Sequence, residues 1–224
     1  MIVTIDGTTG SGKSTAAARL AARLGAAHLD TGAMYRALTL KALETGVDLE
    51  DAGALAALAQ ASTIDLDGEP GAQRVRLDGR DVTAAIRENR ISTNSHYLAS
   101  AAAVRKVLVA KQREFAARVG SLVTEGRDQG TVVFPDATVK FFLNAAPEER
   151  ARRRQVELES RGEIKSFREV LAEVVERDRR DSTRKADPLR PAEQAVHVDT
   201  SAMTIDEMVD VLEAEVRRRT GEAT

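Results

Sequence analysis

The stretch Gly-Thr-Thr-Gly-Ser-Gly-Lys-Ser at residues 7–14 constrains this chain more than any other feature of its sequence. It matches the pattern G-x-x-x-x-G-K-[S/T], in which glycines let successive backbone N–H groups converge on phosphate oxygens. The apolar segment before it, residues 1–6, predicts a short buried strand, and a helix is expected from Lys13 to about Leu24. A strand, a glycine-rich turn and a helix N-terminus in this order predict a phosphate-binding loop in an α/β domain.

The same stretch predicts how ATP and Mg²⁺ would be bound. Lys13 is expected to bridge the β- and γ-phosphates, and the hydroxyl of Ser14 is expected to face Mg²⁺. The predicted ATP-binding residues of this loop are Gly7, Thr8, Thr9, Gly10, Ser11, Gly12, Lys13, Ser14 and Thr15. The motif indicates a nucleoside triphosphate but does not identify the reaction.

The rest of the chain alternates between helical and extended patterns. Residues 35–60 read as helices interrupted at Gly46 and Gly53, and residues 63–83 alternate as short antiparallel strands do. Further buried strands are expected at residues 121–125, 138–143 and 195–201. Strands alternating with helices predict an α/β fold with a doubly wound parallel sheet, and the antiparallel segment predicts a small inserted lobe.

Three later helices are expected from the spacing of apolar residues. They lie around residues 104–115, from Phe167 to about Arg180, and after Thr204. Thr204 and Glu207 form a capping box for the last helix. Its predicted apolar face consists of Ile205, Met208, Val209, Leu212 and Val216.

Composition narrows the partners that this chain can have. There are 33 Lys and Arg against 35 Asp and Glu, a net charge of −2, without the basic excess of a non-specific nucleic-acid binder. Aromatic residues make up 3% and Trp is absent, so platforms for base stacking are not expected. No apolar run approaches the roughly 20 residues of a membrane helix. With no cysteine and no basic leader, we expect a cytoplasmic protein without nucleic-acid or membrane partners.

Arginines stand where open α/β sheets place their ligands. Arg127 and Asp128 directly follow the strand expected at residues 121–125, Arg36 follows the segment LDTGAMY, and Arg105 begins a helix. A convergence of guanidinium groups at one edge of a sheet would require anions. These positions therefore predict a second anionic ligand beside the triphosphate.

Two more groups of charged residues allow more than one interpretation. Arg177, Asp181 and Arg184 fall on one helical side if the helix continues that far, but Arg177 and Asp181 could equally form a solvated pair worth about 0.3–0.5 kcal/mol. The cluster at residues 150–154 could be a solvated face, a nucleic-acid patch, or a mobile lid whose arginines close on the transferred phosphoryl group. Spacing does not decide which of Arg150, Arg153 and Arg154 would do so.

Six segments resemble, in order, the successive signatures of the bacterial cytidylate kinases: IDGTTGSGKST, LDTGAMYRALT, DGRDVTAAIR, TEGRDQGTVVFPDATVKFFL, ERDRRDSTR and VHVDTSAMTIDEMV. The resemblance covers nearly the whole chain and implies a three-layer P-loop NTPase fold in a single domain, residues 1–224. It implies a core (about 1–30, 104–145 and 167–224), a lobe binding the nucleoside monophosphate (about 31–103) and a lid (about 146–166). It also implies Mg²⁺-assisted phosphoryl transfer from ATP to CMP or dCMP by a monomer.

The resemblance also assigns roles to site residues. Cytosine would be contacted by Thr31, Arg105 and Asp128, and the monophosphate would be held by Arg36, Arg127 and Arg184. Arg177 and Asp181 would meet the ribose, Tyr35 would line the acceptor pocket, and Arg153 would join the ATP site. Lys13, Arg36, Arg127 and Arg184 would act in catalysis through position and charge, without a nucleophile or a dedicated base.

The chemistry of the bases agrees with a cytosine ligand. Cytosine presents an amino donor where uracil presents an acceptor, so a carboxylate such as Asp128 favours cytosine. Departures from the family pattern are Thr8 in place of a proline, Gln129 in place of an apolar residue, and His96 in place of a ribose-contacting serine beside Ser95. The last leaves the choice between CMP and dCMP open. Another P-loop kinase, for UMP, dTMP or shikimate, and a regulatory P-loop ATPase remain alternatives.

Overall fold

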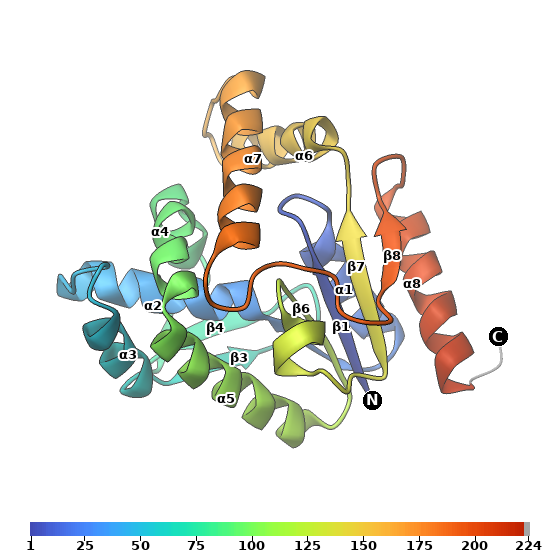
Figure 1. Ribbon diagram of the computed structural model, residues 1–224, viewed down its shortest axis with the longest axis horizontal. Helices are drawn as coiled ribbons and strands as arrows, with labels where there is room; N and C mark the ends of the chain where they lie inside the picture. The colour runs from blue at the N-terminus through green and yellow to red at the C-terminus, as the bar shows by residue number, and fades with distance from the viewer. Residues whose placement is uncertain (222–224) are drawn as a thin grey trace.

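A five-stranded parallel sheet forms the centre of the protein, whose computed structural model describes residues 1–221 (Figure 1). The strands are β1 (Ile2–Gly7), β2 (Ala27–Asp30), β6 (Leu122–Gly126), β7 (Val139–Asn144) and β8 (Val196–Asp199). Their order is β2-β6-β1-β7-β8, and every neighbouring pair is parallel. Because the first strand lies in the middle, the chain leaves it at the centre of the carboxyl edge, where open α/β sheets bind ligands.

Helices cover both faces of this sheet, which gives the expected three layers. They are α1 (Lys13–Arg23), α2 (Thr31–Thr45), α5 (Ala102–Val119) and α8 (Ile205–Thr220). On one face, α1 and α8 share a core with Val3, Ile5 and Phe141 of the sheet. On the other face, α2 and α5 pack over Leu29 and Leu122. The predicted doubly wound sheet is confirmed.

The last helix forms as its sequence predicts. The side chain of Thr204 accepts a hydrogen bond from the backbone N–H of Glu207 at 3.3 Å, and the Glu207 carboxylate accepts one from the N–H of Thr204 at 2.8 Å. All of the predicted apolar positions except Ile205 are buried, and Ile205 packs at the margin of the same core. Local capping and apolar spacing agree here, so the helix could be predicted without tertiary information.

A second, three-stranded antiparallel sheet lies in the segment between β2 and α5. The elements of this segment after α2 are α3 (Ala52–Gln60), β3 (Ile64–Asp67), β4 (Arg74–Leu77), β5 (Arg80–Asp81), the short η1 (Ala85–Arg87) and α4 (Asn89–Ser100). The expected short strands are confirmed, as is the helix end at Gly46. The expected interruption at Gly53 is wrong, because the Asp51 carboxylate accepts hydrogen bonds from the N–H groups of Gly53 and Ala54, both at 2.9 Å, and starts α3 before the glycine.

Two elements, β2 and α4, have no clear signal in the sequence. β2 has only four residues and ends in a charged one, and α4 buries only Ile91 and Leu98 among mostly polar residues. Neither segment has enough apolar periodicity to be identified locally. Both form because neighbouring elements cover them, β6 beside β2 and α2 beside α4.

Two helices form a hairpin that rises above the carboxyl edge of the sheet (Figure 1). They are α6 (Pro147–Glu159) and α7 (Phe167–Thr183). A small core of their own, made of Ala151, Leu158, Val170 and Val174, joins them. The hairpin thus has its own packing and stands beside the site rather than within the main core.

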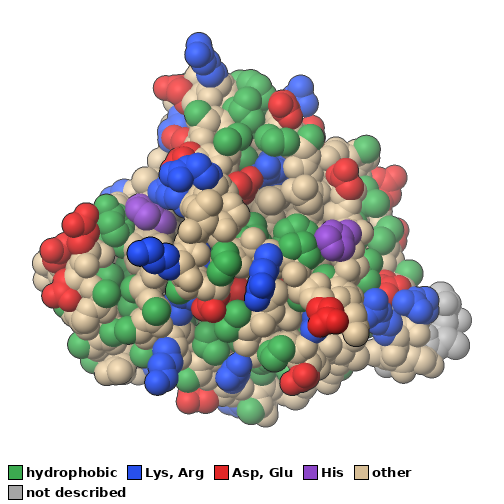
Figure 2. Space-filling view, in the orientation of Figure 1, with side chains coloured by type: hydrophobic (Ala, Val, Ile, Leu, Met, Phe, Trp, Pro, Cys, Tyr) green, Lys and Arg blue, Asp and Glu red, His purple; other side chains and the backbone are tan. Residues whose placement is uncertain are grey.

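The surface is mixed in charge. On the face shown in Figure 2, basic and acidic side chains are interspersed, in keeping with the net charge of −2. None of the helices in the described chain combines the length and the apolar character that crossing a bilayer requires.

Candidate active site

A cavity of about 670 Å³ opens at the carboxyl edge of the sheet, between the glycine-rich loop, the α6–α7 hairpin and the helices α2 and α4. Most of the residues predicted for the site line it. They are Thr9, Gly10, Gly12, Lys13, Ser14, Thr15, Thr31, Tyr35, Arg36, Arg105, Arg127, Asp128, Arg153, Arg177, Asp181 and Arg184. Gly7, Thr8 and Ser11 lie in the loop but do not line the cavity.

The glycine-rich loop joins β1 to α1 in the expected way. Gly12 caps α1 with a φ of 89°, a conformation that a residue with a side chain rarely adopts. At Gly7 a Cβ atom would lie 1.9 Å from the carbonyl oxygen of Leu143, so only glycine fits against β7. Thr8 donates its N–H to the same oxygen at 3.2 Å, a hydrogen bond that a proline could not make. The loop is therefore anchored to β7 on one side and to α1 on the other.

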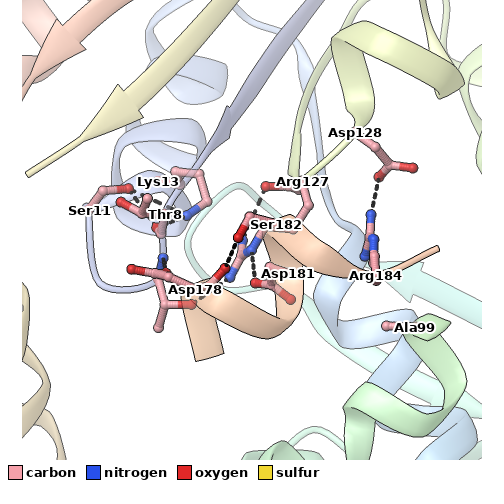
Figure 3. Close-up of polar contacts among 12 residues, drawn as sticks. Thr8, Ser11, Lys13, Ala99, Arg127, Asp128, Asp178, Asp181, Ser182 and Arg184 are labelled. Atoms are coloured by element: carbon pink, nitrogen blue, oxygen red, sulfur yellow. Dashed lines mark hydrogen bonds and ion pairs between the residues drawn. The ribbon is translucent and has the colours of Figure 1, made fainter. Parts of the chain in front are cut away.

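Lys13 is folded into this loop. Its Nζ donates to the carbonyl oxygen of Thr8 at 2.5 Å and lies 3.4 Å from Oγ of Ser11 (Figure 3). Burial, and then the positive charge of Arg127, lowers the pKa of Lys13 to about 7. A buried ammonium next to arginines is stabilised by an anion, which makes this position suitable for phosphate.

Glu125 lies beside Ser14 and has no role in the expectations from sequence. The hydroxyl of Ser14 donates to Oε1 of Glu125 at 2.6 Å. Burial, and then the nearby Asp30, raises the pKa of Glu125 to about 7. In the sequence, Glu125 stands out as the charged residue of a segment, LVTEG, that is otherwise uncharged; in the structure all five residues are buried. A hydroxyl and a carboxylate side by side are hard oxygen donors of the kind that Mg²⁺ prefers.

Two of the predicted acceptor-site arginines are held by carboxylates. Arg36 donates through Nη2 to Asp30 at 2.8 Å. Arg127 donates through Nε to Asp181 at 2.7 Å and through Nη2 to the hydroxyl of Thr9 at 2.9 Å. Figure 3 shows Arg127 between α7 and the glycine-rich loop. Arg127 therefore links the two sides of the cavity.

The wall of the cavity contains a buried ion pair. Arg105 donates through Nη2 to Asp128, and their side chains are 3% and 7% exposed. The Nη1 of Arg105 donates to the hydroxyl oxygen of Tyr35 at 3.2 Å, and burial raises the pKa of Tyr35 to about 12. Thr31 donates its hydroxyl proton to the carbonyl oxygen of Glu125 at 2.7 Å, so toward a ligand this oxygen can only accept.

Arg177 differs from these arginines. Within residues 1–221 it makes no hydrogen bond and no ion pair, although it lines the cavity. Burial, and then the charge of Arg127, lowers the pKa of Arg177 to about 10. The charge of Asp181 opposes this shift without forming an ion pair, so Arg177 remains a desolvated cation beside which a bound anion would be strongly favoured.

The helix that carries Arg177 and Asp181 ends before Arg184. Arg177 and Asp181 lie on α7, but this helix ends at Thr183, and Arg184 has an extended backbone with φ −61° and ψ 144°. Arg184 still lines the cavity, because the chain turns back toward Asp128. The condition for a shared helical side, that the helix continues to Arg184, is therefore not met, and Arg184 reaches the cavity from the loop after α7.

Three of the four arginines of α6, the candidates for contact with the transferred phosphoryl group, have different environments. Arg150 is buried and donates to the carbonyl oxygens of Ala145 and Thr9 at 2.8 and 2.9 Å, away from the cavity. Arg153 lines the cavity and donates to the carbonyl oxygen of Thr200 at 2.6 Å. Arg154 also lines it and pairs with Glu157 at 2.7 Å. Arg153 and Arg154 can thus reach a ligand, whereas Arg150 holds the hairpin on the glycine-rich loop.

Ser95 and His96 both line the cavity from α4. The hydroxyl of Ser95 donates to the carbonyl oxygen of Ser92 at 2.9 Å, and Nδ1 of His96 lies 2.8 Å from the carbonyl oxygen of Thr93. Gln129, which follows Asp128, is buried and accepts a hydrogen bond from the hydroxyl of Thr124 at 2.9 Å. The unusual Gln129 is thereby part of a satisfied internal network, while either α4 residue can face a ligand.

Comparison with known proteins shows one family. The family model described as cytidylate kinase matches residues 3–218. The cytidylate kinase of Pelotomaculum thermopropionicum is 49% identical over 216 residues, which are 96% of this chain and 95% of that protein. That of Mycobacterium avium is 48% identical, covering 98% and 96%. A bifunctional pantoate ligase/cytidylate kinase of Synechococcus sp. is 47% identical over 99% of this chain, which spans 45% of that longer protein.

Proposed function

Because the chain belongs to the cytidylate kinase family, we propose that it transfers the γ-phosphoryl group of ATP to CMP and dCMP, yielding ADP and CDP or dCDP. One observation carries the proposal beyond family membership. Arg177, a desolvated arginine that makes no hydrogen bond or ion pair with the described residues, lines the same cavity as Lys13 and the glycine-rich loop. Two adjacent anion-binding regions in one cavity suit a donor triphosphate and an acceptor monophosphate.

The donor would be held by the glycine-rich loop. Backbone N–H groups of residues 7–15 and the N-terminus of α1 would bind its phosphates, and Lys13 would move from the oxygen of Thr8 to the transferred group. Arg153, which lies beside this loop, would approach the donor from the hairpin. Positioning and neutralisation of charge account for most of the rate that phosphoryl transfer needs.

The acceptor monophosphate would lie among Arg36, Arg127 and Arg184, with Arg177 and Asp181 toward the ribose. Carboxylates or carbonyl oxygens already orient the first three arginines, so their guanidinium groups need little rearrangement on binding. Such preorganisation lowers the entropy that binding must overcome. No side chain has to act as a nucleophile, since the monophosphate itself attacks.

Cytosine would be read by the part of the cavity wall that contains the ion pair of Arg105 and Asp128. The Oδ1 atom of Asp128 can accept a hydrogen bond from an exocyclic amino group, while Oδ2 is engaged by Arg105. The hydroxyl oxygen of Thr31 is likewise restricted to accepting from a ligand. A uracil would present its own acceptor to these acceptors and leave them unpaired, which is the basis of strong discrimination.

Mg²⁺ would be held at Ser14 and Glu125. In the described residues no group of three or more His, Asp or Glu side chains is arranged to bind a metal by itself, so nucleotide phosphates would complete the coordination. When bound, Mg²⁺ neutralises charge on the phosphate oxygens. In this chain, Glu125 and the hydroxyl of Ser14 supply oxygens already 2.6 Å apart.

We further propose that the segment at residues 146–166 acts as a lid, together with the part of α7 that packs on it. The shared core of the hairpin supports movement as one body, and closure would exclude water from the transfer. We also propose a monomer, as the family resemblance implies. The cysteine-free composition suits a reducing compartment, and we propose a cytoplasmic location.

The direct test is a panel of acceptors. Purified protein would be given ATP and Mg²⁺ with CMP, dCMP, UMP, dTMP, AMP or shikimate in separate reactions, and ADP release would be followed. We expect the largest kcat/KM with CMP or dCMP. Faster release with UMP, dTMP or shikimate would replace the proposed acceptor, and release that needs no acceptor but responds to nucleic acid would indicate a regulatory ATPase.

A further inference from the structure

Four charged residues form a closed ring at the base-recognition end of the cavity. The carboxylate of Asp187 accepts from Nε of Arg105 at 2.7 Å, and Nη2 of Arg105 donates to Oδ2 of Asp128. The other oxygen of Asp128, Oδ1, lies 4.0 Å from Nη2 of Arg184, as Figure 3 shows. Arg184 closes the ring, because its Nε donates at 2.7 Å to the backbone carbonyl oxygen of Asp187.

Asp187 has a different position from the other three members of this ring. The side chains of Arg105, Asp128 and Arg184 are 3%, 7% and 5% exposed and line the cavity, whereas that of Asp187 is 35% exposed and does not. It contacts two arginines at once, one through its side chain and one through its backbone. A residue outside the cavity thus orients two residues inside it.

The backbone conformation of Asp187 makes this double contact possible. Its φ is 48°, in the left-handed region, which Asp and Asn enter more readily than most other residues. The loop returns to α7 two residues later, where the N–H of Leu189 donates to the carbonyl oxygen of Asp181 at 2.8 Å. The turn therefore directs both the carboxylate and the carbonyl oxygen of Asp187 toward the cavity wall.

From this geometry we infer that Asp187 is a positioning residue for base recognition, through Arg105 and Arg184. The inference rests on the proposed function, since it takes cytosine as the base and Asp128 as its reader. By fixing Nε of Arg105, Asp187 determines which way the guanidinium faces, and so keeps Nη2 on Oδ2 of Asp128. The Oδ1 atom of Asp128, which lies 4.0 Å from Arg184 without a hydrogen bond to it, is then held in one place, where it can accept a hydrogen bond from an amino group.

A substitution of Asp187 removes its contact with Arg105, which the side chain makes, but keeps its contact with Arg184, which the backbone makes. Without the carboxylate, Arg105 can rotate, and Asp128 loses its defined orientation, so discrimination between CMP and UMP should weaken. The carbonyl oxygen would still hold Arg184, and the monophosphate contact would persist. The ATP site, formed by residues 7–15, shares no contact with Asp187 and should be unaffected.

Three variants separate these effects. Asp187→Gly removes the carboxylate but allows the positive φ, and Asp187→Asn keeps an oxygen acceptor and tolerates this conformation without the charge. Gln194→Gly is the matched control, because Gln194 has a φ of 61° in the same segment and does not line the cavity. Each would be assayed with varied CMP or UMP at saturating ATP and Mg²⁺, and with varied ATP at saturating CMP, with Tm measured in parallel.

We expect Asp187→Gly to lower the ratio of kcat/KM for CMP to kcat/KM for UMP by about tenfold, and Asp187→Asn to lower it by about threefold. These are the effects expected when an oriented polar contact is lost. The KM for ATP should change less than about twofold, and Gln194→Gly should retain the wild-type ratio. An unchanged ratio in folded Asp187→Gly would overturn the inference, whatever its Tm. If that variant does not fold, an unchanged ratio in Asp187→Asn does so. Wild-type protein that does not phosphorylate CMP would overturn the proposed function and this inference together.

Discussion

The proposed donor and acceptor sides of the cavity are built on different principles. The donor side is one contiguous stretch, residues 7–15, in which backbone geometry is set by glycines such as Gly7 and Gly12. The acceptor side consists of side chains from the turn after β6, from α2, α5 and α7, and from the loop after α7, which meet only in the folded protein. Local conformation therefore forms the first, and long-range packing of charged residues forms the second.

Electrostatics differ between the two sides in the same way. On the donor side, Lys13 is held by neutral oxygens of its own loop, which it can leave when phosphate binds. On the acceptor side, Arg36, Arg105 and Arg127 are each paired with a carboxylate, and Arg177 alone among these has none. The donor side depends on one mobile cation, and the acceptor side on a network. Substitutions should thus have one large effect on the first side and several graded effects on the second.

The largest effect is expected from Lys13→Ala. Removal of the only cation of the donor loop should lower kcat by about a thousandfold or more, because charge on the transferred phosphoryl group is no longer neutralised. The Tm should change by only a few degrees, since Nζ contacts only atoms of its own loop. Steady-state kinetics and thermal unfolding would measure both.

Lys111→Ala is a matched control for this substitution, because Nζ of Lys111 donates to the carbonyl oxygen of Ser62, outside the cavity. Its kcat should stay near the wild-type value. A Lys13→Ala enzyme that retained kcat within tenfold of the wild type would show that the two sides do not differ as described.

An intermediate effect is expected from Arg177→Gln. The loss of the arginine without a counterion should raise the KM for CMP by about tenfold, with a smaller change in the KM for ATP. The substitution should leave the fold intact or stabilise it slightly, because it removes a desolvated charge that has no partner among the described residues. Kinetics with varied CMP and with varied ATP separate the two constants. An increase confined to the KM for ATP would show that Arg177 acts on the donor and not on the acceptor.

Asp128→Asn should act on selectivity more than on rate. Asparagine keeps the shape of the side chain but can present an amino group, so the ratio of kcat/KM for CMP over UMP should fall by about tenfold. Loss of the carboxylate partner of buried Arg105 should also lower Tm by several degrees. Asp199→Asn provides a control, because Asp199 is exposed and its carboxylate accepts a hydrogen bond from the N–H of Ser201. An unchanged ratio would mean that other residues read the base.

The smallest effect concerns the scaffold beneath the acceptor side. His28 on β2 is 8% exposed, both of its ring nitrogens lack a hydrogen-bond partner, and burial lowers its pKa below the usual 6.5. As the pH falls below about 6.5, His28 binds a proton in the unfolded chain but not in the folded protein. The free energy of unfolding therefore decreases, by up to about 1.4 kcal/mol per pH unit, until the pH reaches the pKa of His28 in the folded state.

His28→Leu should remove this part of the acid sensitivity. Between pH 7 and about pH 5.5, Tm of the variant should fall less than Tm of the wild type, which thermal unfolding across this range would measure. His197→Leu, at an exposed position of β8, should retain the wild-type dependence. Equal slopes for wild type and His28→Leu would show that His28 does not contribute.

Prediction from sequence succeeded where the signal was local and failed where it was not. The loop at residues 7–14, the central strands and the Thr204 capping box were predictable because neighbouring residues supply the conformation. Gly53 was misleading, since Asp51 starts α3 before the glycine can end a helix. Whether Arg184 shares a helical side with Arg177 and Asp181 was left open by the sequence, and the end of α7 at Thr183 shows that it does not. Glu125 and Asp187 were missed because the side chains that they contact, those of Ser14 and Arg105, lie more than 80 residues away in the sequence.

By itself, the sequence determined the glycine-rich loop, most of the strands and helices, and the family, since these depend on contiguous patterns of glycine, apolar and capping residues. Only the tertiary structure decided which carboxylate orients which arginine, that Arg177 lacks a counterion within residues 1–221, and that Asp187 faces two arginines from outside the cavity. The physical reason is that charge pairing and desolvation depend on distance and burial in space, and sequence spacing carries neither.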